Sequence, residues 1–136
     1  MSSSKNQIYL PPINFAMVAP GIYRSGYPNK KNFEFLKKIK LKSILYLCPE
    51  AYANQNVEFA RENGIKVLQY GIEGNKEPFI HIPEDVIQRA VKELLDESRH
   101  PILIHCNKGK HRTGVLVGCF RKQQQWSLTS IFDEYR

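Results

Sequence analysis

One thiol and one guanidinium, Cys106 and Arg112, are separated by five residues within the stretch 102–114. The apolar run 102–104 predicts a buried strand, Gly109 lies in the loop that follows, and 113–117 predicts the opening of a helix. A loop between a strand end and a helix N-terminus directs backbone N–H groups and the positive helix dipole at one spot. The stretch therefore predicts a cradle for an anion, with a thiol and a guanidinium inside it.

The two side chains suit displacement at phosphorus. Helix N-termini and nearby cations lower the pKa of a cysteine, so Cys106 is expected to be a thiolate nucleophile. Arg112 can grip two oxygens of a phosphoryl group and stabilise their charge in the transition state. The backbone N–H groups of 107–112 are expected to bind the remaining oxygens, and Gly109 lets the chain curl closely. The pattern predicts a phosphocysteine intermediate.

This stretch resembles a known family. His105-Cys106-x5-Arg112-Thr113 is similar to the signature H-C-x5-R-[S/T] of the cysteine-dependent phosphatases, and the string 105–114 resembles the plant and fungal atypical dual-specificity phosphatases. That subfamily includes the inositol pyrophosphate phosphatase of yeast. The stretches 21–25, 41–45, 74–79 and 126–135 match as well, so the resemblance covers nearly everything from Pro11 onward.

The resemblance implies further roles. Thr113 is expected to donate a hydroxyl hydrogen bond to the cysteine sulfur, which would make sulfur a better leaving group when water attacks; the alternative is a plain helix start. His105 is expected to orient the loop rather than to act as a base. Arg24 either lines the pocket rim or ties down the N-terminal strand.

Three basic side chains in the loop, Lys108, Lys110 and His111, indicate what kind of phosphate substrate the site accepts. Asn107 and Gly109 contribute backbone to the cradle, whereas Lys108, Lys110 and His111 add potential cations that a lone phosphate on an aromatic ring does not require. Lysines in this loop resemble those of the 3-phosphoinositide phosphatases, where they meet neighbouring phosphates. The alternative is that these side chains point into solvent.

This chain differs from the wider superfamily at the position of the general acid. In the superfamily, an Asp on the loop after the preceding strand protonates the leaving oxygen. This chain has no Asp before Asp85; the expected position is occupied by 73–77, so either Glu77 (or Glu73) serves or no side chain does. An alkoxide leaving group needs a proton, whereas a phosphate leaving from a diphosphate has a pKa of about 6 and scarcely does. The missing Asp favours a phosphoanhydride, with Lys76 and Asn75 as further substrate ligands.

Composition sets the wider limits. The chain has 136 residues, 42% of them apolar, with a formal charge of +7 and a pI near 9.4. This balance favours anionic partners, namely a polyphosphorylated small molecule or a phosphoprotein. Seven cations lie between 24 and 42, where a solvated helix face is the simplest interpretation. We expect no nucleic-acid partner, no integral membrane association, no cofactor or metal, and a cytoplasmic location.

The three cysteines form neither a disulfide framework nor a zinc pattern. Cys48 and Cys119 are expected to be small core residues. The alternative for Cys48 is a protective disulfide with Cys106, if its strand ends at the same sheet edge.

Strands and helices alternate along the chain. Residues 1–12 are expected to form a flexible lead-in and 13–136 a single phosphatase domain. Strands are predicted at 13–18, 43–47, 65–70 and 102–104. Helices are predicted over 29–40 with Asn29 or Asn32 as the cap, after the cap Asn54 with Gly64 at its C-terminal stop, from Pro83, from Thr113, and after the cap Ser127. Inward-facing residues are expected to include Val57, Phe59 and Ala60 in the second helix, and Val86, Ile87, Ala90, Val91, Leu94 and Leu95 in the third. This order predicts an α/β fold with a mainly parallel sheet covered by helices on both faces.

Ligands of such sheets lie outside the carboxyl ends of the strands, so the 71–82 loop is expected to overhang Cys106. The sequence predicts a metal-independent phosphatase for the β-phosphate of inositol pyrophosphates. The alternatives are a tyrosine or dual-specificity protein phosphatase or a phosphoinositide phosphatase with the same site, a phosphate-binding module without turnover, and a rhodanese-type sulfurtransferase.

Overall fold

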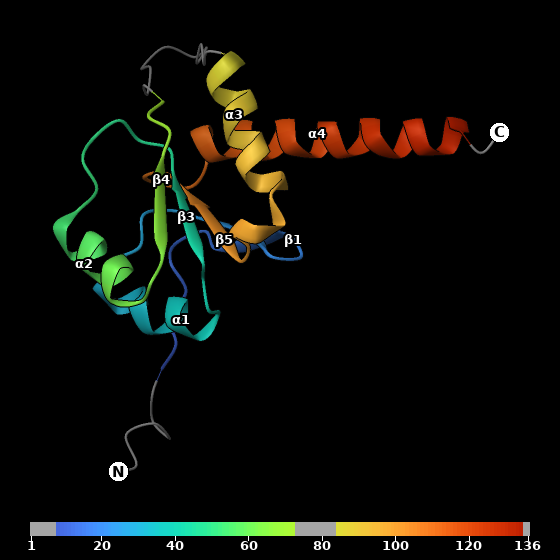
Figure 1. Ribbon diagram of the computed structural model, residues 1–136. Helices are drawn as coiled ribbons and strands as arrows, with labels where there is room; N and C mark the ends of the chain where they lie inside the picture. The colour runs from blue at the N-terminus through green and yellow to red at the C-terminus, as the bar shows by residue number, and fades with distance from the viewer. Residues whose placement is uncertain (1–7, 73–83, 135–136) are drawn as a thin grey trace.

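The computed structural model describes residues 8–72 and 84–134, with backbone alone over 126–134. A five-stranded sheet forms the centre, in the order β1-β2-β5-β3-β4 (Figure 1). The strands are β1 (Ala16–Ala19), β2 (Ile22–Ser25), β3 (Ser43–Tyr46), β4 (Lys66–Gln69) and β5 (Ile102–His105). Only the pairing of β1 with β2 is antiparallel. The predicted α/β fold with a mainly parallel sheet is confirmed.

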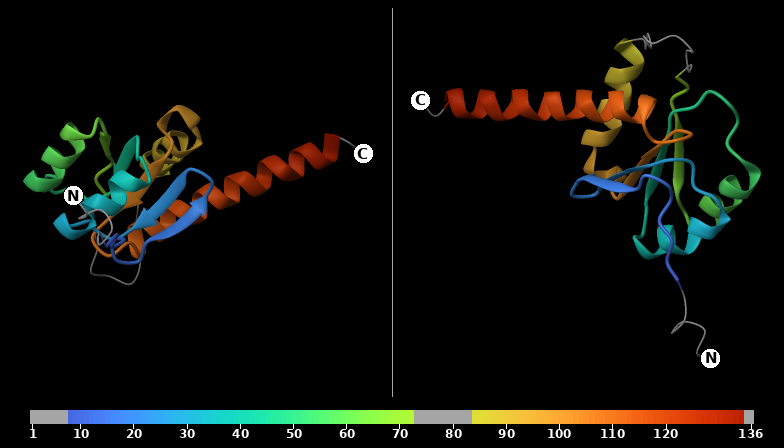
Figure 2. Two further views of the ribbon diagram at one scale, coloured as in Figure 1. Left: turned by 90° about the horizontal axis from the view of Figure 1, so that it is seen from below. Right: turned by 180° about the vertical axis from the view of Figure 1, so that it is seen from behind.

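Helices cover both faces of this sheet, as the two views of Figure 2 show. Helices α1 (Phe33–Lys38) and α2 (Asn54–Glu62) lie on one face, with α1 preceded by the short helix η2 (Lys30–Asn32). Helices α3 (Glu84–Leu95) and α4 (His111–Glu134) lie on the other, and η3 (Glu97–Arg99) links α3 to β5. The described residues contain no helix with the length and apolar character that crossing a lipid bilayer requires.

Successive side chains of the central strands point to opposite faces of the sheet and so contribute to two hydrophobic cores. Leu103 and Ile44 face α1 and α2, where they pack with Leu36 and Phe59. Their neighbours face α3 and α4 in a larger cluster that includes Leu45, Ile102, Ile104, Ala90, Leu94, Leu116 and Phe120. Strands β3 and β5 are buried along their whole length because helices cover both faces.

The register brings three strand ends to one edge. Ser25 of β2 and Tyr46 of β3 both pair with His105, the last residue of β5. Segments that follow β2, β3 and β5 therefore meet outside the carboxyl ends of the strands, where ligands of parallel sheets bind.

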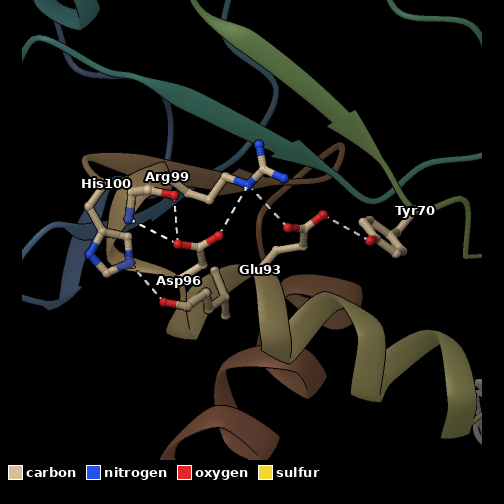
Figure 3. Close-up of polar contacts among 7 residues, drawn as sticks. Tyr70, Glu93, Asp96, Arg99 and His100 are labelled. Carbon is tan, nitrogen blue, oxygen red and sulfur yellow. Dashed lines mark hydrogen bonds and ion pairs between the residues drawn. The ribbon is translucent and has the colours of Figure 1, made fainter.

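Polar contacts fasten α3 to strand β4 (Figure 3). The Tyr70 hydroxyl, one residue after β4, donates to Glu93 Oε2 at 3.0 Å, and Arg99 Nε lies 3.2 Å from Glu93 Oε1. Arg99 also pairs with Asp96 at 3.8 Å. Glu93 thus joins Tyr70, just after β4, to Arg99 of η3, and the half-buried Arg99–Glu93 pair holds the carboxylate that Tyr70 contacts.

Several local predictions hold. Asn29, one of the two predicted caps, is the N-cap of η2: its side chain accepts a hydrogen bond from the Lys31 N–H, and the Asn32 side chain accepts one from the Asn29 N–H. Asn32, the other predicted cap, makes no side-chain cap hydrogen bond at the start of α1. Helix α2 ends before Gly64, which has φ +64°, as expected of a C-terminal stop.

Other local predictions are wrong. The first strand spans Ala16–Ala19 rather than 13–18, because residues 13–14 form a turn in which Asn14 has φ 58°. Ala53 rather than Asn54 is the N-cap of α2, and its side chain has no donor or acceptor for a cap. Val57 and Leu95 are each 45% exposed, because they lie at the margins of their helical stripes.

The largest correction concerns the C-terminal helix. Ser127 does not cap a separate helix: it lies inside α4, which continues without a break from His111 to Glu134. Residues 119–126 contain neither Gly nor Pro, and 122–125 are good helix formers, so nothing ends the helix before Ser127. Most of the predicted 71–82 loop, and Pro83, lie outside the described residues.

Candidate active site

Cys106 directly follows the central strand β5, and Arg112 lies in the first turn of α4. The connection is short because Gly109 adopts φ +74°, a left-handed conformation that glycine accepts without strain. A Cβ at Gly109 would lie 2.5 Å from the carbonyl carbon and oxygen of Ser25, so the loop packs against the end of β2 without room for a side chain. Strand β5, Gly109 and helix α4 together place the Cys106 thiol next to the N-terminus of α4.

The Cys106 sulfur is buried and accepts two hydrogen bonds. The Thr113 hydroxyl donates to Sγ at 3.1 Å, and the Gly109 N–H donates at 3.3 Å. Burial by itself would raise the pKa of the Cys106 thiol. The bonds from the Thr113 hydroxyl, the Thr113 and Gly109 backbone and the charge of Arg112 outweigh it, and the net pKa lies below the ordinary value.

The loop carbonyls are held away from the sulfur by donors on the outer side. Tyr27 N–H donates to the Asn107 carbonyl at 2.9 Å, and Arg24 Nη2 donates to the Gly109 carbonyl at 2.9 Å. Asn14 Nδ2 donates to the Lys108 carbonyl at 2.7 Å. Because the carbonyl and N–H of a trans peptide point in opposite directions, carbonyls fixed outward turn the N–H groups inward. Arg24 thus supports the loop from behind in this structure.

His105 is buried and packs among Tyr27, Tyr46 and Tyr52, with ring centroids 4.9–5.5 Å from its own. Its Nδ1 lies 3.1 Å from the Cys106 carbonyl and its Nε2 lies 2.8 Å from the Tyr52 hydroxyl. Burial lowers the pKa of His105 to about 4, so the imidazole is neutral at pH 7. A neutral ring with both nitrogens engaged fits the predicted structural role.

The site opens to solvent as a cavity of about 220 Å³ lined by Cys106, Asn107, Lys108, Lys110, His111 and Arg112. Six residues predicted from the sequence are thereby brought together. Lys108, Lys110 and His111 are exposed at the mouth, where they can meet an anion larger than one phosphoryl group. Arg112 Nη1 donates to the Ile72 carbonyl at 3.3 Å, so the segment after β4 reaches the same edge.

Four predicted or alternative residues, Glu73, Asn75, Lys76 and Glu77, lie outside the described residues. Cys48, Cys106 and Cys119 are free. Cys48 lies at the same sheet edge as Cys106, because its Sγ lies 3.6 Å from Oδ1 of Asn107, the residue that follows Cys106. Burial raises the pKa of Cys48, in contrast to Cys106. Among the described residues, no group of three or more His, Cys, Asp or Glu is placed to hold a metal ion.

Four supporting residues were missed by sequence reasoning: Asn14, Tyr27, Tyr52 and Ile72. Two of them act through backbone atoms, Tyr27 N–H and the Ile72 carbonyl, which no side-chain pattern reveals. Tyr52 and Asn14 lie 53 and 94 residues from their partners. The Tyr27 hydroxyl also accepts a hydrogen bond from the Ala53 N–H at 2.9 Å, but Ala53 lies 26 residues away, so no local signal reveals this contact.

A buried thiol with a lowered pKa after a central parallel strand, a loop whose carbonyls are held outward and a guanidinium at the helix start are the features of the cysteine-dependent phosphatases. The sequence comparison agrees with the geometry. Residues 9–136 match the tyrosine phosphatase family, and the chain belongs to it.

Similar proteins are found in plants and fungi. Inositol diphosphatase DSP4 of Arabidopsis thaliana is 60% identical over 130 residues, which cover 96% of this chain and 66% of that protein. Inositol diphosphatase SIW14 of Saccharomyces cerevisiae is 54% identical over 132 residues, which cover 96% of this chain and 47% of that protein. This chain thus spans between about half and two thirds of the length of these relatives.

The solved structure of the Siw14 catalytic core superposes on this chain with a TM-score of 0.84 at 53% sequence identity, covering 96% of this chain and 78% of that one. A second structure of that core, in complex with citrate, gives a TM-score of 0.83 at 52% identity, covering 95% and 77%. The predicted resemblance and fold class are therefore confirmed at the level of sequence and backbone.

Proposed function

We propose that this chain is a metal-independent phosphatase that hydrolyses the β-phosphate of inositol pyrophosphates, such as 5-diphosphoinositol pentakisphosphate, through a phosphocysteine at Cys106. The observation that carries the proposal is the sulfur itself, which is buried, accepts hydrogen bonds from Thr113 and Gly109, and lines the same cavity as Arg112. Relatives named inositol diphosphatases support the substrate class.

In the first step the Cys106 thiolate attacks the terminal phosphorus. A P–S bond forms as the bond from that phosphorus to the bridging oxygen breaks, and the bonding electrons leave with the bridging oxygen on the inositol phosphate. Arg112 and the loop N–H groups hold the three equatorial oxygens, on which negative charge is spread in the transition state. Because the leaving phosphate is a weak base, little proton donation is required.

In the second step water attacks phosphorus and the P–S bond breaks. Inorganic phosphate leaves, the water proton passes to phosphate or solvent, and the electron pair returns to sulfur as thiolate. The Thr113 hydroxyl, 3.1 Å from Sγ, stabilises that returning charge. The same bond that favours the thiolate before attack thus lowers the barrier to its departure.

The basic side chains at the mouth of the cavity support a polyphosphate substrate. Lys108, Lys110 and His111 surround the opening and are exposed, so phosphates next to the reacting one would meet positive charge there. Beyond the described residues, Lys76 and Asn75 are proposed as further ligands, and Glu77 as the acid if one is needed. A cytoplasmic location completes the proposal, since reducing conditions there keep Cys106 as a free thiol.

The alternative is a protein phosphatase that uses the same site, and one comparison favours it: a probable tyrosine-protein phosphatase of Dictyostelium discoideum is 44% identical over 128 residues, which cover 94% of this chain and 77% of that protein. The two substrates differ in what the leaving group needs. A phosphoserine alkoxide requires a proton, so an acid at Glu77 would be essential for it.

The test is turnover of 5-diphosphoinositol pentakisphosphate compared with phosphotyrosine and phosphoserine peptides, with kcat/KM measured for each. We expect the diphosphate to be preferred, Cys106→Ser to abolish turnover while retaining binding, and Glu77→Gln to cost little on the diphosphate. Much faster processing of phosphopeptides would overturn the substrate assignment. Loss of diphosphate turnover in Glu77→Gln would show instead that the anhydride needs an acid.

A further inference from the structure

One peptide group links the N-terminal segment to the reactive sulfur. The peptide between Lys108 and Gly109 accepts a hydrogen bond at its carbonyl from Asn14 Nδ2, at 2.7 Å, and donates one from its N–H to Cys106 Sγ, at 3.3 Å. In a trans peptide these two groups point in opposite directions, so fixing one fixes the other. A donor on the carbonyl also polarises the peptide and strengthens the bond made by its N–H.

The backbone around Asn14 is built to hold this contact. Asn14 has φ 58°, a left-handed conformation that Asn tolerates better than most residues. Its predecessor Ile13 accepts a hydrogen bond from the Gly26 N–H at 2.7 Å. Gly26 in turn packs against the loop: a Cβ there would lie 3.0 Å from the Asn107 carbonyl oxygen and 2.5 Å from Ile13 Cγ2. The turn at 13–14 is therefore seated directly against the phosphate loop.

We propose that Asn14 is a positioning residue for the reaction, which aims the Gly109 N–H at the Cys106 sulfur through the Lys108–Gly109 peptide. The proposal rests on Cys106 being the nucleophile, as in the proposed function. Asn14 lies outside the signature stretch and does not itself line the cavity. Its contact with the lining is made at the backbone carbonyl of Lys108. It acts on the thiolate from behind the loop, across one peptide plane.

Other groups near the sulfur define what Asn14 has to be distinguished from. Arg112 on α4 lowers the pKa of the Cys106 thiol by its charge, and Cys48, two residues after β3, interacts electrostatically with the same thiol. The neutral His105 precedes the cysteine, and Lys108, Lys110 and His111 line the cavity. Of these groups, only Lys108 is bonded by the Asn14 side chain, and that bond is made to its backbone carbonyl. A change in the titration of Cys106 on removal of the Asn14 side chain is therefore expected to report the Lys108–Gly109 peptide.

The experiment measures the pH profile of Cys106 alkylation by iodoacetamide in the full chain, with the signal of a Cys106→Ser chain subtracted to remove Cys48 and Cys119. Asn14→Gly keeps the left-handed backbone and removes the amide. Asn14→Asp keeps size and backbone preference but replaces the donor with a carboxylate. We expect the midpoint to rise in both, with the thiolate fraction below the midpoint falling about threefold in Asn14→Gly and further in Asn14→Asp.

Asn63→Gly is the matched control. Asn63 Nδ2 also donates to a carbonyl, that of Phe59 at 2.8 Å, but at the end of α2, away from the thiol. We expect its alkylation profile to equal that of the unmodified chain. Profiles of both Asn14 variants that coincide with the control would overturn the proposal. Should Asn14→Gly not fold, the isosteric Asn14→Asp decides alone.

The readout requires no substrate, which separates the two proposals. If Asn14 variants shift the alkylation midpoint but the unmodified chain does not turn over 5-diphosphoinositol pentakisphosphate, the proposed substrate fails, whereas the aiming of the Gly109 N–H at the Cys106 sulfur by Asn14 stands. If turnover is as proposed and the midpoint stays fixed, the positioning role fails alone.

Discussion

Replacing Thr113 by valine tests the bond that the account places on the sulfur. Valine exchanges the hydroxyl for a methyl group of similar size at a fully buried position, so the Oγ1–Sγ bond of 3.1 Å is lost while the backbone contacts of residue 113 stay. A hydrogen bond to a charged group contributes about 1.5–3 kcal/mol. The lower end applies because the Gly109 N–H continues to bind Sγ.

A loss of about 1.5 kcal/mol corresponds to roughly a tenfold lower thiolate fraction at pH values below the midpoint. The same bond stabilises the thiolate as it departs from phosphorus, so hydrolysis of the phosphocysteine should slow by about tenfold as well. The second effect has a kinetic signature. When the second step limits turnover, one equivalent of inositol phosphate is released quickly and the rest slowly.

The assay combines alkylation against pH with rapid-mixing kinetics on 5-diphosphoinositol pentakisphosphate. Thr113→Ser, which retains the hydroxyl, is the control and should resemble the unmodified chain in both. An alkylation midpoint unchanged in Thr113→Val, together with no burst, would refute the reasoning and leave Thr113 as an ordinary helix residue.

Three further outcomes follow from the geometry. Arg112→Lys keeps the charge but loses the bidentate hydrogen bonds to two phosphoryl oxygens, so kcat should fall by roughly 100-fold or more. A kcat that stays within about tenfold of the unmodified chain would contradict bidentate binding by Arg112. Gly109→Ala should abolish folding or activity, since its Cβ would meet backbone at 2.5 Å, whereas Gly64→Ala, with nothing within 4 Å, should cost only the left-handed strain of about 1–2 kcal/mol in denaturant unfolding. Equal effects would show that the loop relaxes. Burial holds the pKa of His105 at about 4, below its unfolded value, so the unfolded chain gains a proton first as pH falls. The free energy of unfolding should therefore drop by about 2 kcal/mol between pH 7 and pH 5, and His105→Asn should lose most of that slope; an unchanged slope would contradict a buried neutral imidazole.

The sequence predicted the parts of the fold that depend on local pattern. Short apolar runs predicted the buried strands β3 and β5, and the helical period of apolar residues predicted α3. The position of a glycine between Cys106 and Arg112 predicted the tight loop that joins β5 to α4. The proposed nucleophile, the guanidinium and the threonine hydroxyl lie within eight residues, so the local fold alone brings them together.

What could not be predicted depends on contacts between distant segments. Asn14 and Tyr52 reach the loop from segments 94 and 53 residues away, and neither lies in a periodic pattern. The length of α4 was also missed, because a serine before an apolar run is a valid cap signal even where the preceding residues continue a helix. The helix propensity of the residues before Ser127 outweighed the capping preference of that serine.

The most direct test of the central claim is to trap the covalent intermediate. The chain would be mixed with terminally labelled 5-diphosphoinositol pentakisphosphate, quenched with acid within the first turnover, digested, and mapped by mass spectrometry. The account predicts phosphate on the peptide that contains Cys106, more of it in Thr113→Val, and none in Cys106→Ser. Continued turnover with phosphate on another residue, or on no residue, would contradict it.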